Sequence, residues 1–431
     1  MDTLKNQNDP IGVDKQTLLD RVSGERIKDR IERIAEHTAT PGEGCSRFTY
    51  SEEDRCVRDM ILDWFDTLGL QVNVDAVGNI RARLVGKNPD LAPVVTGSHI
   101  DTVPHGGKFD GVTGVVSAIE AVTCIVDSGF RPERSIEIII FAEEEGSNFG
   151  MTTAGSKTLV GTFSEQDLHH LKNEDGVSMF EMAERFGLHP EHCEQDRIRP
   201  GDVDAMIELH VEQSIVLDRE GPSIGIVQAI AGGNFYRVHF IGEANHAGAT
   251  PMDMRKDAMV AAANAIARFH ELVMEKKLKD TVGTVGQIHC EPNGSNVIAE
   301  RVTFTLDIRD VVQEGIDRIT DDLEAMFNEV AETFNVTCEI EPVGTSKPVR
   351  LSERIIGVIE HAAQSAGLDY RLMNSGAVHD AAEMTPVTDV GMIFVPSIDG
   401  KSHKPDEHTH ISDIQLGCKL LLSALLDLTA R

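Results

Sequence analysis

The sequence predicts an α/β fold in which a mixed, largely parallel sheet forms the main domain and a smaller α+β domain is inserted into it. The chain has 431 residues, which is more than one hydrophobic core usually organises. Helix and strand signals alternate in its first and last parts. Strand signals and one long helix dominate the middle, which indicates a separate unit.

The first part of the chain carries the strand, helix, strand pattern of a parallel sheet. Residues 71–86 alternate apolar and polar side chains around a turn at Gly78, which predicts a strand pair. Residues 92–100 and 134–142 contain short β-branched runs typical of buried strands. Between them, residues 112–126 repeat Val and Ile at helical spacing. A strand, a helix and a second strand in this order predict a parallel pair.

The middle of the chain has another pattern. Residues 221–242 indicate two strands paired with each other, and residues 257–278 indicate a long helix. Residues 281–290 and 301–310 are two further strand candidates. Strands that outnumber helices in this way predict a compact α+β unit.

The return of the first pattern sets the expected domain boundaries. After about residue 337, helix and strand signals alternate again up to a closing helix near the end of the chain. We therefore expect residues 1–219 and 337–431 to form one catalytic domain, with residues 220–336 inserted as a lid and dimerisation domain.

The formal net charge of −31 narrows the possible partners. Nucleic-acid binding needs clustered Lys and Arg, so we expect no nucleic-acid partner, and we expect no membrane partner either. The first twenty residues contain no apolar leader segment, and no run of eighteen apolar residues occurs. Seven cysteines are scattered without CxxC spacing, which indicates reduced thiols. These features predict a cytoplasmic protein.

Polar residues able to bind metal ions follow the expected strands. An open α/β sheet usually binds its ligands at this edge, outside the carboxyl ends of the strands. The clusters are His99, Asp101 and Asp110 in GSHIDTVPHGGKFDG, Glu143 to Glu145 in AEEEG, His210 in IELHVEQ and His403 in IDGKSHKPDEHTH.

Two interpretations of these clusters are open. The chain has 17 histidines, and any one of them taken alone is more often a surface or core residue than a ligand. Three consecutive carboxylates at a strand end, however, repel one another unless a cation neutralises them. Carboxylates mixed with imidazoles suit zinc, manganese or cobalt, and Asp110 is the candidate for a carboxylate shared by two ions. The glutamate cluster therefore favours a metal site.

A series of longer motifs runs in order along most of the chain. From residue 47 onward they are RFTYSEED, DAVGNIRARLVG, GSHIDTVPHGGKFDG, EEEGSNFG, HVEQ, GEANHAGATPMDMRKDA, PNGSNVI, LDIRD, SGAVHDA and MIFVPSIDGKSHKPDE. Together they resemble the amidase/hydantoinase/carbamoylase family of dinuclear metallohydrolases, which includes N-carbamoyl-L-amino-acid hydrolases and allantoate amidohydrolases within the carboxypeptidase-like zinc hydrolases. ANHAGATPM, and MIFVPS followed by SHKP, are the most specific of these motifs.

The resemblance implies two divalent metal ions per subunit. The implied ligands are His99, Asp110 and His210 for one ion, and Asp110, Glu145 and His403 for the other. Glu144 would be the general base, and Glu143 is one glutamate more than the family commonly has before its glycine. Asp101 would hydrogen-bond to His99 and fix its tautomer.

The resemblance also implies how a small ureido acid would bind. The implied substrate contacts are Gln213, His246, Asn296, Arg309 and His379. The guanidinium of Arg309 would donate two parallel hydrogen bonds to a carboxylate. His246 would stabilise the oxyanion formed from the ureido carbonyl. Taken alone, Arg309 in LDIRD is explained equally well as a strand residue paired with Asp307 or Asp310.

The function that follows is metal-dependent hydrolysis of the ureido C–N bond of an N-carbamoyl-L-amino acid or allantoate, with release of ammonia and carbon dioxide. Ser214 and Val378 stand where the family usually has glycine, next to substrate-contact positions, so the exact substrate stays open. One alternative is a related aminoacylase or dipeptidase that cleaves an amide. Another is a catalytically inactive metal-dependent binding protein, against which the retention of Glu144 argues.

We also expect a homodimer formed through the inserted domain. Its long helix and strand edge suit a two-fold contact. His246 lies far in sequence from the ligands, in the Gly- and Pro-punctuated segment GEANHAGATPM. Domain closure or a neighbouring subunit would therefore have to bring it to the metals. The structural alternative is that His246 only caps a turn at the surface and has no role in catalysis.

Overall fold

The protein is described by a computed structural model that covers residues 14–430. Residues 1–13, which form part of the expected leader-free start, and Arg431 lie outside the described residues. The chain divides into two compact units. The first unit contains the residues up to Gln228, Leu351–Met373 and the residues from Val378 onward, and the second contains Ala229–Arg350 and Asn374–Ala377.

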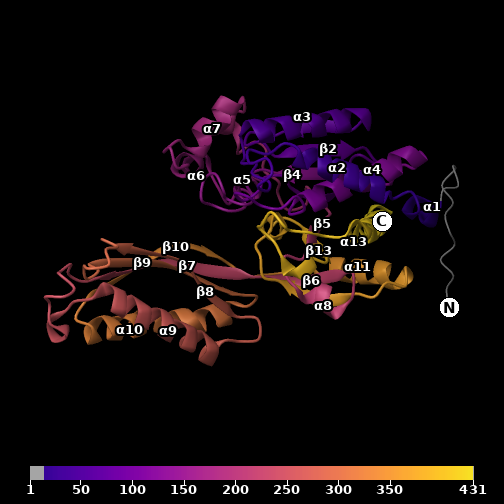
Figure 1. The fold of residues 1–431 in the computed structure, drawn as a ribbon. Coiled ribbons are helices and arrows are strands. Elements are labelled where there is room, and N and C mark those ends of the chain that lie inside the picture. Colours follow the sequence, from indigo (N-terminus) through magenta and orange to yellow (C-terminus); the bar gives the residue numbers. More distant parts are fainter. Residues whose placement is uncertain (1–13, 431) are drawn as a thin grey trace. The chain divides into compact units, whose positions relative to one another are not determined.

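The larger of two sheets has nine strands (Figure 1). In pairing order they are β1 (Gln71–Val74), β2 (Ile80–Leu84), β4 (Ile136–Phe141), β3 (Val94–His99), β5 (Ala205–Val211), β13 (Asp389–Val395), β6 (Gly225–Ile230) and β11 (Val349–Arg350), and β12 (Arg371–Ser375) pairs with β6. The central strands β4, β3, β5 and β13 run parallel, whereas β1, β2, β6 and β11 pair antiparallel.

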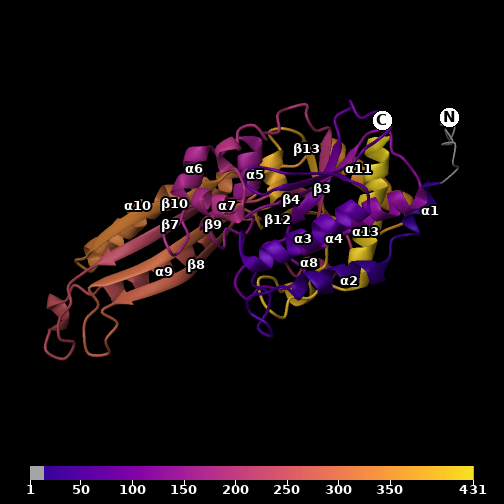
Figure 2. The ribbon, with the colours of Figure 1, turned by 90° about the horizontal axis from the view of Figure 1, so that it is seen from above.

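Helices surround this sheet. They are α1 (Lys15–Leu19), α2 (Gly24–Ala35), α3 (Glu52–Thr67), α4 (Val112–Ser128), α5 (Ala154–Val160), α6 (Glu165–His170), α7 (Met179–Phe186), α8 (Val216–Glu220), α11 (Glu353–Ser365), α12 (Asp380–Met384) and α13 (Ile411–Thr429), with short 3-10 turns η1 (Pro190–His192) and η3 (Ile398–Gly400). Figure 2 shows α2, α4 and α13 side by side. Almost all of α4 is buried, and its Glu120 is neutralised by Arg26 and Arg30 of α2.

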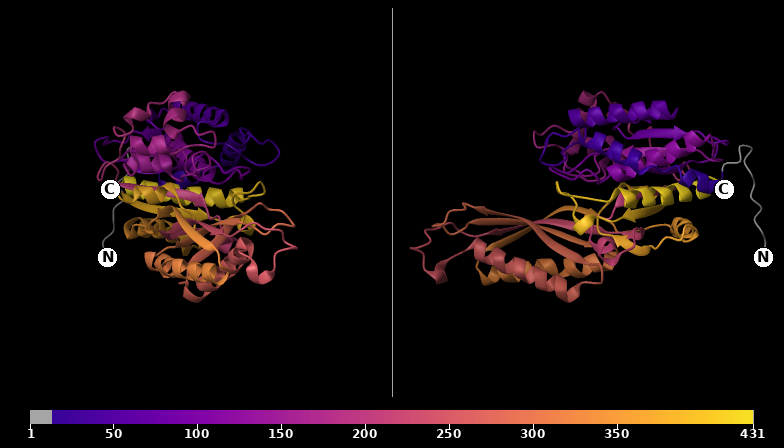
Figure 3. Two further views of the ribbon diagram at one scale, coloured as in Figure 1. Left: turned by 90° about the vertical axis from the view of Figure 1, so that its left-hand side faces the viewer. Right: turned by 45° about the vertical axis from the view of Figure 1, so that its right-hand side comes forward.

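The second unit is a four-stranded antiparallel sheet covered on one face by two helices (Figure 3). The strands pair in the order β10 (Thr337–Ser346), β7 (Gly232–Ile241), β9 (Arg301–Asp310) and β8 (Val282–Glu291), and the helices are α9 (Ala258–Lys276) and α10 (Gln313–Thr333), with the turn η2 (Met252–Met254). Alternate residues of β9 are buried, and Phe304 packs with Phe240 and Phe327 in the core. The other face of β9 carries Asp307 and Arg309.

One local prediction is wrong. The two strands expected to pair within residues 221–242 are β6 and β7, but they belong to different sheets. β6 pairs with β13, and β7 pairs with β9 and β10. Only Ala231 separates the two strands, which leaves no room for a reversing turn, so the chain passes directly from one sheet to the other.

The second unit also includes β10, which lies beyond the predicted limit of residue 336.

The mixed sheet, in which the central strands are parallel and the outer ones antiparallel, and the separate antiparallel unit confirm the predicted α/β fold class with an α+β insertion. Within residues 14–430, no helix is both long and apolar enough to cross a membrane.

Candidate functional site

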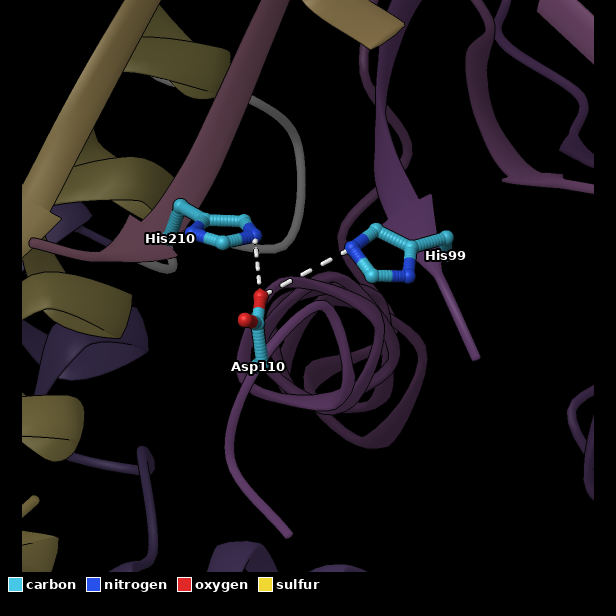
Figure 4. A group of neighbouring side chains, drawn as sticks. All are labelled: His99, Asp110 and His210. Atoms are coloured by element: carbon cyan, nitrogen blue, oxygen red, sulfur yellow. Dashed lines mark ion pairs between the residues drawn. The ribbon is translucent and has the colours of Figure 1, made fainter. Parts of the chain in front are cut away.

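Three side chains converge at the carboxyl ends of parallel strands in the first unit (Figure 4). His99 is the last residue of β3, His210 lies near the end of β5, and Asp110 precedes α4. The potential ligand atoms of the three all lie within 4.8 Å of one another, and all three residues are buried. The sheet topology therefore brings together the residues that the resemblance assigns to one metal ion.

The carboxylate of Asp110 faces two sets of partners, one with each oxygen. Its Oδ1 lies 3.2 Å from Nε2 of His210 and 3.8 Å from Nε2 of His99. Its Oδ2 lies 3.1 Å from Nε2 of His403, and that Nε2 is 3.5 Å from Oε2 of Glu145. Asp110, Glu145 and His403 form a second group of donor atoms within 4.8 Å. Asp110 thus belongs to both groups, as a bridging carboxylate must.

Backbone carbonyls orient the two buried histidines. Nδ1 of His99 lies 3.0 Å from the carbonyl oxygen of Asp101, and Nδ1 of His210 lies 2.9 Å from that of Val211. When such a ring is neutral and its Nδ1 donates its proton to the carbonyl, Nε2 is unprotonated, which is the form that binds metal. In both histidines it is Nε2 that faces Asp110.

Gly111 allows the ring of His99 to approach the start of α4. A Cβ atom at this position would lie 2.4 Å from Cε1 of His99, and the backbone φ of +64° also favours glycine. The backbone amide of Gly111 donates to Nε2 of His210 at 3.2 Å. The glycine after Asp110 is therefore part of the packing around the two histidines.

The last two glutamates after β4 turn toward this cluster. Oε2 of Glu144 lies 3.7 Å from Nε2 of His99, and Glu145 contacts His403 as described. The backbone amides of Glu144 and Glu145 donate to the carboxylate of Asp101 at 3.2 and 3.0 Å. Asp101 thus contacts His99 through its carbonyl and holds the glutamate turn through its carboxylate.

Glu143 turns elsewhere. Its Oε1 accepts hydrogen bonds from the backbone amides of Asn148 and Phe149, at 3.0 and 2.9 Å. Its backbone amide donates to Oγ1 of Thr49 at 2.9 Å. The additional glutamate therefore holds the loop that follows the turn.

Burial and neighbouring charges shift the pKa values in the cluster. Burial raises the pKa of Glu144 well above its usual range, and burial together with the charge of Asp110 raises the pKa of Glu145 to about 7. Burial also acts to raise the pKa of Asp110, but hydrogen bonds from His210 and His403 outweigh it and hold that pKa well below its usual range. A cation would stabilise the ionised form of such crowded carboxylates.

Two oxygens in the cluster also indicate that a cation binds there. Oε1 of Glu145 and Oε1 of Gln213 are buried and have no hydrogen-bond partner among the described residues. A buried polar atom without a partner costs about 1–3 kcal/mol, so an oxygen in this state is a natural place for a cation. Imidazole nitrogens and carboxylate oxygens together suit a divalent metal ion. The residues present therefore fit a metal-binding site.

Gln213 and His379 border the cluster. Nε2 of Gln213 donates to Oδ2 of Asp110 at 2.9 Å and lies 3.4 Å from Nε2 of His403. The buried ring of His379 packs against that of His210, with 4.7 Å between the ring centroids. Gln213 thus contacts the shared carboxylate of the cluster, and His379 packs against one of its histidines.

Glu208 forms a third group of donor atoms with His210 and His379. Its two oxygens are already engaged, one by Oγ of Ser98 at 2.7 Å and the other by the backbone amide of Ala381 at 3.2 Å. We interpret Glu208 as support for the surrounding side chains.

In the second unit, His246 and Asn296 lie beside each other on exposed segments. The backbone amide of Ala247 donates to the carbonyl of Asn296 at 2.9 Å, and His246 pairs with Val297 in an isolated bridge. Nδ1 of His246 accepts from the backbone amide of Gly248 at 3.1 Å. The turn that carries His246 is therefore fixed by the segment that carries Asn296.

Arg309 lies at the other end of the same sheet. Arg301 of β9 pairs with Ile241 at the end nearer His246, whereas Arg309 pairs with Gly233 at the opposite end. The eight residue steps from Arg301 to Arg309 span about 26 Å, at about 3.3 Å per residue. The structure brings His246 and Asn296 together but does not bring Arg309 to them.

The guanidinium of Arg309 is already paired. Its Nε and Nη2 donate to the two carboxylate oxygens of Asp307 at 2.8 and 2.9 Å, and its Nη1 donates to the carbonyl of Gly376 at 3.2 Å. Asp310 points to the opposite, buried face of β9. Of the two expected pairings, the one with Asp307 is the one found. A guanidinium has five N–H donors, so two of those on Arg309 are left for a ligand.

Sequence reasoning missed three buried carboxylates around the cluster: Glu208, Asp380 and Glu407. Glu208 had a signal, because it is a charged residue in the apolar strand IELHV, two positions before His210 and so on the same face. Asp380 directly follows a residue already singled out. Glu407 ends the quoted motif SHKPDE, but nothing in that motif indicated its contact with the backbone of Asp110, nearly three hundred residues away in sequence.

Residues 95–427 match the family model described as Peptidase family M20/M25/M40. This match covers well over half of the chain and includes every residue of the donor groups around Asp110. The chain belongs to the M20/M25/M40 family.

Relatives of this M20/M25/M40 member align over nearly its whole length. The N-carbamoyl-L-amino-acid amidohydrolase of Pseudomonas sp. (strain NS671) is 38% identical over 407 residues, which cover 94% of this chain and 98% of the relative. The allantoate amidohydrolase of Bacillus subtilis (strain 168) is 36% identical over 404 residues, with coverages of 93% and 97%. These similarities confirm the predicted family and show that the chain is a hydrolase.

A solved structure extends the similarity to the fold of the M20/M25/M40 member. The crystal structure of an amidase of the hydantoinase/carbamoylase family from Burkholderia multivorans superposes with a TM-score of 0.86 at 33% identity, covering 95% of this chain and 99% of that chain. Family membership and the donor groups around Asp110 together indicate a metal-binding site.

Proposed function

We propose that this M20/M25/M40 hydrolase cleaves the ureido C–N bond of an N-carbamoyl-L-amino acid or of allantoate, releasing ammonia and carbon dioxide. The observation that carries the proposal is the carboxylate of Asp110, which faces one donor group with each oxygen. The names of relatives that align over nearly the whole chain support the substrate class.

Two divalent ions per subunit, zinc, manganese or cobalt, complete the proposed site. His99, Asp110 and His210 would hold one ion, and Asp110, Glu145 and His403 the other. When bound, such ions lower the pKa of water toward about 7 and polarise a carbonyl group. The ring orientations of His99 and His210, fixed from behind by backbone carbonyls, support this assignment.

Glu144 is the proposed general base. Its buried carboxylate lies 3.7 Å from Nε2 of His99 and belongs to neither donor group around Asp110. In this role it takes a proton from the attacking water and delivers it to the leaving nitrogen, so one carboxyl group serves both steps. The carbamate formed decomposes to carbon dioxide and ammonia, and the freed amine is the product.

Arg309 is the proposed contact for the carboxylate of the substrate. Asp307 holds one edge of its guanidinium, which fixes the direction of the remaining donors. A guanidinium held in this way offers two parallel hydrogen bonds in one geometry. Gln213 and His379, beside the proposed metal site, are the contacts proposed for the rest of the substrate.

A homodimer is the proposed assembly, with His246 and Asn296 of each subunit acting at the site of its partner. The support is the separation of about 26 Å along β9 between the Arg309 end and the His246 end, at about 3.3 Å per residue. This span is far longer than an N-carbamoyl amino acid. One copy of the unit therefore cannot contact a single substrate molecule with both ends, whereas two copies related by a two-fold axis can.

The proposed dimer contact involves exposed apolar side chains of the second unit. Val260 and Met274 of α9, and Val282 and Ile288 of the edge strand β8, are all at least 45% exposed. An unpaired strand edge beside exposed apolar residues favours association with a second copy. The cytoplasm is the proposed location, supported by seven cysteines that are all free thiols.

Hydrolysis of a substrate panel tests the proposal. Allantoate, N-carbamoyl-L-amino acids and N-carbamoyl-β-alanine are each incubated with enzyme loaded with zinc, manganese or cobalt, and N-acetyl-L-amino acids and dipeptides serve as amide controls. We expect ammonia from a ureido substrate and no free amine from the controls. Cleavage of the amides alone would replace the proposal with an aminoacylase or dipeptidase. Metal binding without any turnover would point to a binding protein.

A further inference from the structure

Glu407 belongs to the loop that carries His403, its carboxylate contacts the loop that carries Asp110, and the proposed reaction does not use it. Only 4% of the surface of Glu407 is exposed to solvent. Its Oε1 accepts hydrogen bonds from the backbone amides of Phe109 and Asp110, at 2.9 and 3.0 Å. A carboxylate that accepts two backbone hydrogen bonds fixes that segment of chain.

Ser402 connects the other oxygen of this carboxylate to the same site. Its Oγ lies 3.2 Å from Oε2 of Glu407 and 3.1 Å from Oδ2 of Asp110. Ser402 also directly precedes His403 in the sequence. The carboxylate of Glu407 therefore links the backbone at Asp110 to the segment that carries His403.

Gly107 provides the space that this link needs. A Cβ atom at residue 107 would lie 2.3 Å from Oε1 and 2.4 Å from Cβ and Cδ of Glu407. Gly107 is not among the glycines with positive φ, so its backbone conformation is open to any residue. The close approach of Glu407 is what requires a glycine here.

We propose that Glu407 is a positioning residue that holds Asp110 in register with His403, so that losing its carboxylate weakens metal binding. This inference rests on the metal site of the proposed function. The two loops are separated by 297 residues of sequence between Asp110 and Glu407. Without the link, metal binding itself would have to order them, and that ordering would reduce the affinity. Loss of a group that orients metal ligands typically costs about 10–100-fold in metal affinity.

Zinc affinity of the full-length protein tests the role of Glu407. The metal-free wild type and variants are titrated with Zn²⁺ in competition with a chromophoric chelator. We expect Glu407→Ala to bind zinc about 10–100-fold more weakly. Gly107→Ala should show the same loss, because its methyl group displaces the Glu407 side chain without changing it. Glu407→Gln should lose less, because its amide oxygen still accepts from the two backbone amides.

Glu212→Gln is the matched control. Glu212 is also buried, and its carboxylate also accepts from two backbone amides, those of Val216 and Leu217, both at 2.9 Å. These amides begin α8 and belong to neither loop of the proposed site. We expect this variant to keep the zinc affinity of the wild type, even where its melting temperature falls.

The outcomes separate a positioning role from a structural one. Wild-type zinc affinity in Glu407→Ala or Gly107→Ala, with only a lower melting temperature of the metal-free protein, would overturn the inference and leave the proposed function standing. An equal loss of zinc affinity in Glu212→Gln would also overturn it, because the effect would then be general destabilisation. A wild type that binds no zinc, manganese or cobalt would overturn the inference and the proposed function together.

Discussion

The two units arrange their candidate functional residues in opposite ways. In the first unit, residues from distant parts of the sequence form groups whose donor atoms lie within 4.8 Å, one group buried and the other reaching the exposed His403. In the second, the proposed substrate contacts stand at the two ends of one sheet, about 26 Å apart by strand length. Parallel strands bring their carboxyl ends to one edge, whereas a long antiparallel strand separates its two ends. In the proposed function, the first unit therefore forms its metal site alone, whereas the second acts together with another copy.

The largest effect is expected in the first unit, at Glu144. We expect Glu144→Gln to lower kcat by about 100- to 10,000-fold, because the variant cannot take up and deliver the proton. Its metal content should equal that of the wild type, since Glu144 belongs to neither donor group around Asp110. Steady-state kinetics and elemental analysis measure the two quantities.

Glu143→Gln is the neighbouring control for this prediction. Glu143 is equally buried but holds the following loop. Its loss should cost far less activity. A metal-loaded Glu144→Gln enzyme with near-normal turnover would move the general base to another residue.

The next effect, in the second unit, tests the separation of its two ends. We expect His246→Ala to lower turnover by about 100- to 1,000-fold, the usual cost of removing one oxyanion donor. Coexpression of His246→Ala with Arg309→Ala subunits should restore activity. In each mixed dimer one site then has both residues intact, so about a quarter of wild-type activity returns if subunits mix at random.

Mixing the two variants distinguishes action within one subunit from action across the dimer. If His246 and Arg309 served the same subunit, no mixed dimer would contain an intact site. Absence of recovery in verified mixed dimers, or a fully active monomer by light scattering, would contradict the proposed assembly.

A smaller effect is expected at the other end of the sheet, at Arg309. Arg309→Lys should raise KM about tenfold with a smaller change in kcat, because an ammonium cannot reproduce two parallel hydrogen bonds to a carboxylate. A ureido analogue without the carboxylate is the control substrate, and both enzymes should process it equally slowly. Hydrolysis of that analogue at the rate of the acid would remove the proposed role of Arg309.

At Asp75, in the turn between β1 and β2 of the first unit, we expect little effect on activity but a pH-dependent effect on stability. Burial raises the pKa of this carboxyl group to about 6. The native state therefore binds the proton more tightly than the unfolded chain, whose usual pKa is 3.8. The stability contributed by this group is present below about pH 4 and is lost as the pH rises to about 6.

Urea unfolding at several pH values measures this contribution in metal-free protein. Asp75→Asn cannot titrate, so its free energy of unfolding relative to wild type should increase between about pH 4 and pH 6 and level off above. A constant difference across this range would show that Asp75 is ionised in the native state throughout.

The sequence predicted the elements that position the first site. Apolar runs and helical spacing identified β3, α4 and β4, and the strand, helix, strand order gave their parallel pairing. Polar residues directly after such strands then had to meet at one edge. His99 and the run Glu143 to Glu145 were singled out in this way, because they lie directly at strand ends. The choice of Glu145 as the ligand within that run came from the family resemblance.

Features that depend on distant contacts were not predicted. Local alternation in residues 221–242 indicated two strands but could not show that their partners lie in different sheets. The motif LDIRD was compatible with two carboxylate partners for Arg309, and only the alternation of β9 removes Asp310. Glu407 lies within the motif SHKPDE, but its contact with the backbone of Asp110 appears only when the chain is folded.

Because the second sheet is long, a small rotation at one end displaces the other end by a large distance. Over a span of about 26 Å, a rotation of only about 2° at the Arg309 end moves the opposite end by about 1 Å, and a misplacement of that size can cost about 100-fold in rate. In the proposed assembly, stiffness along β7 and β9 is therefore a catalytic requirement. Substitutions in the apolar core beneath these strands, such as at Phe304, can impair catalysis without touching any group that meets the substrate.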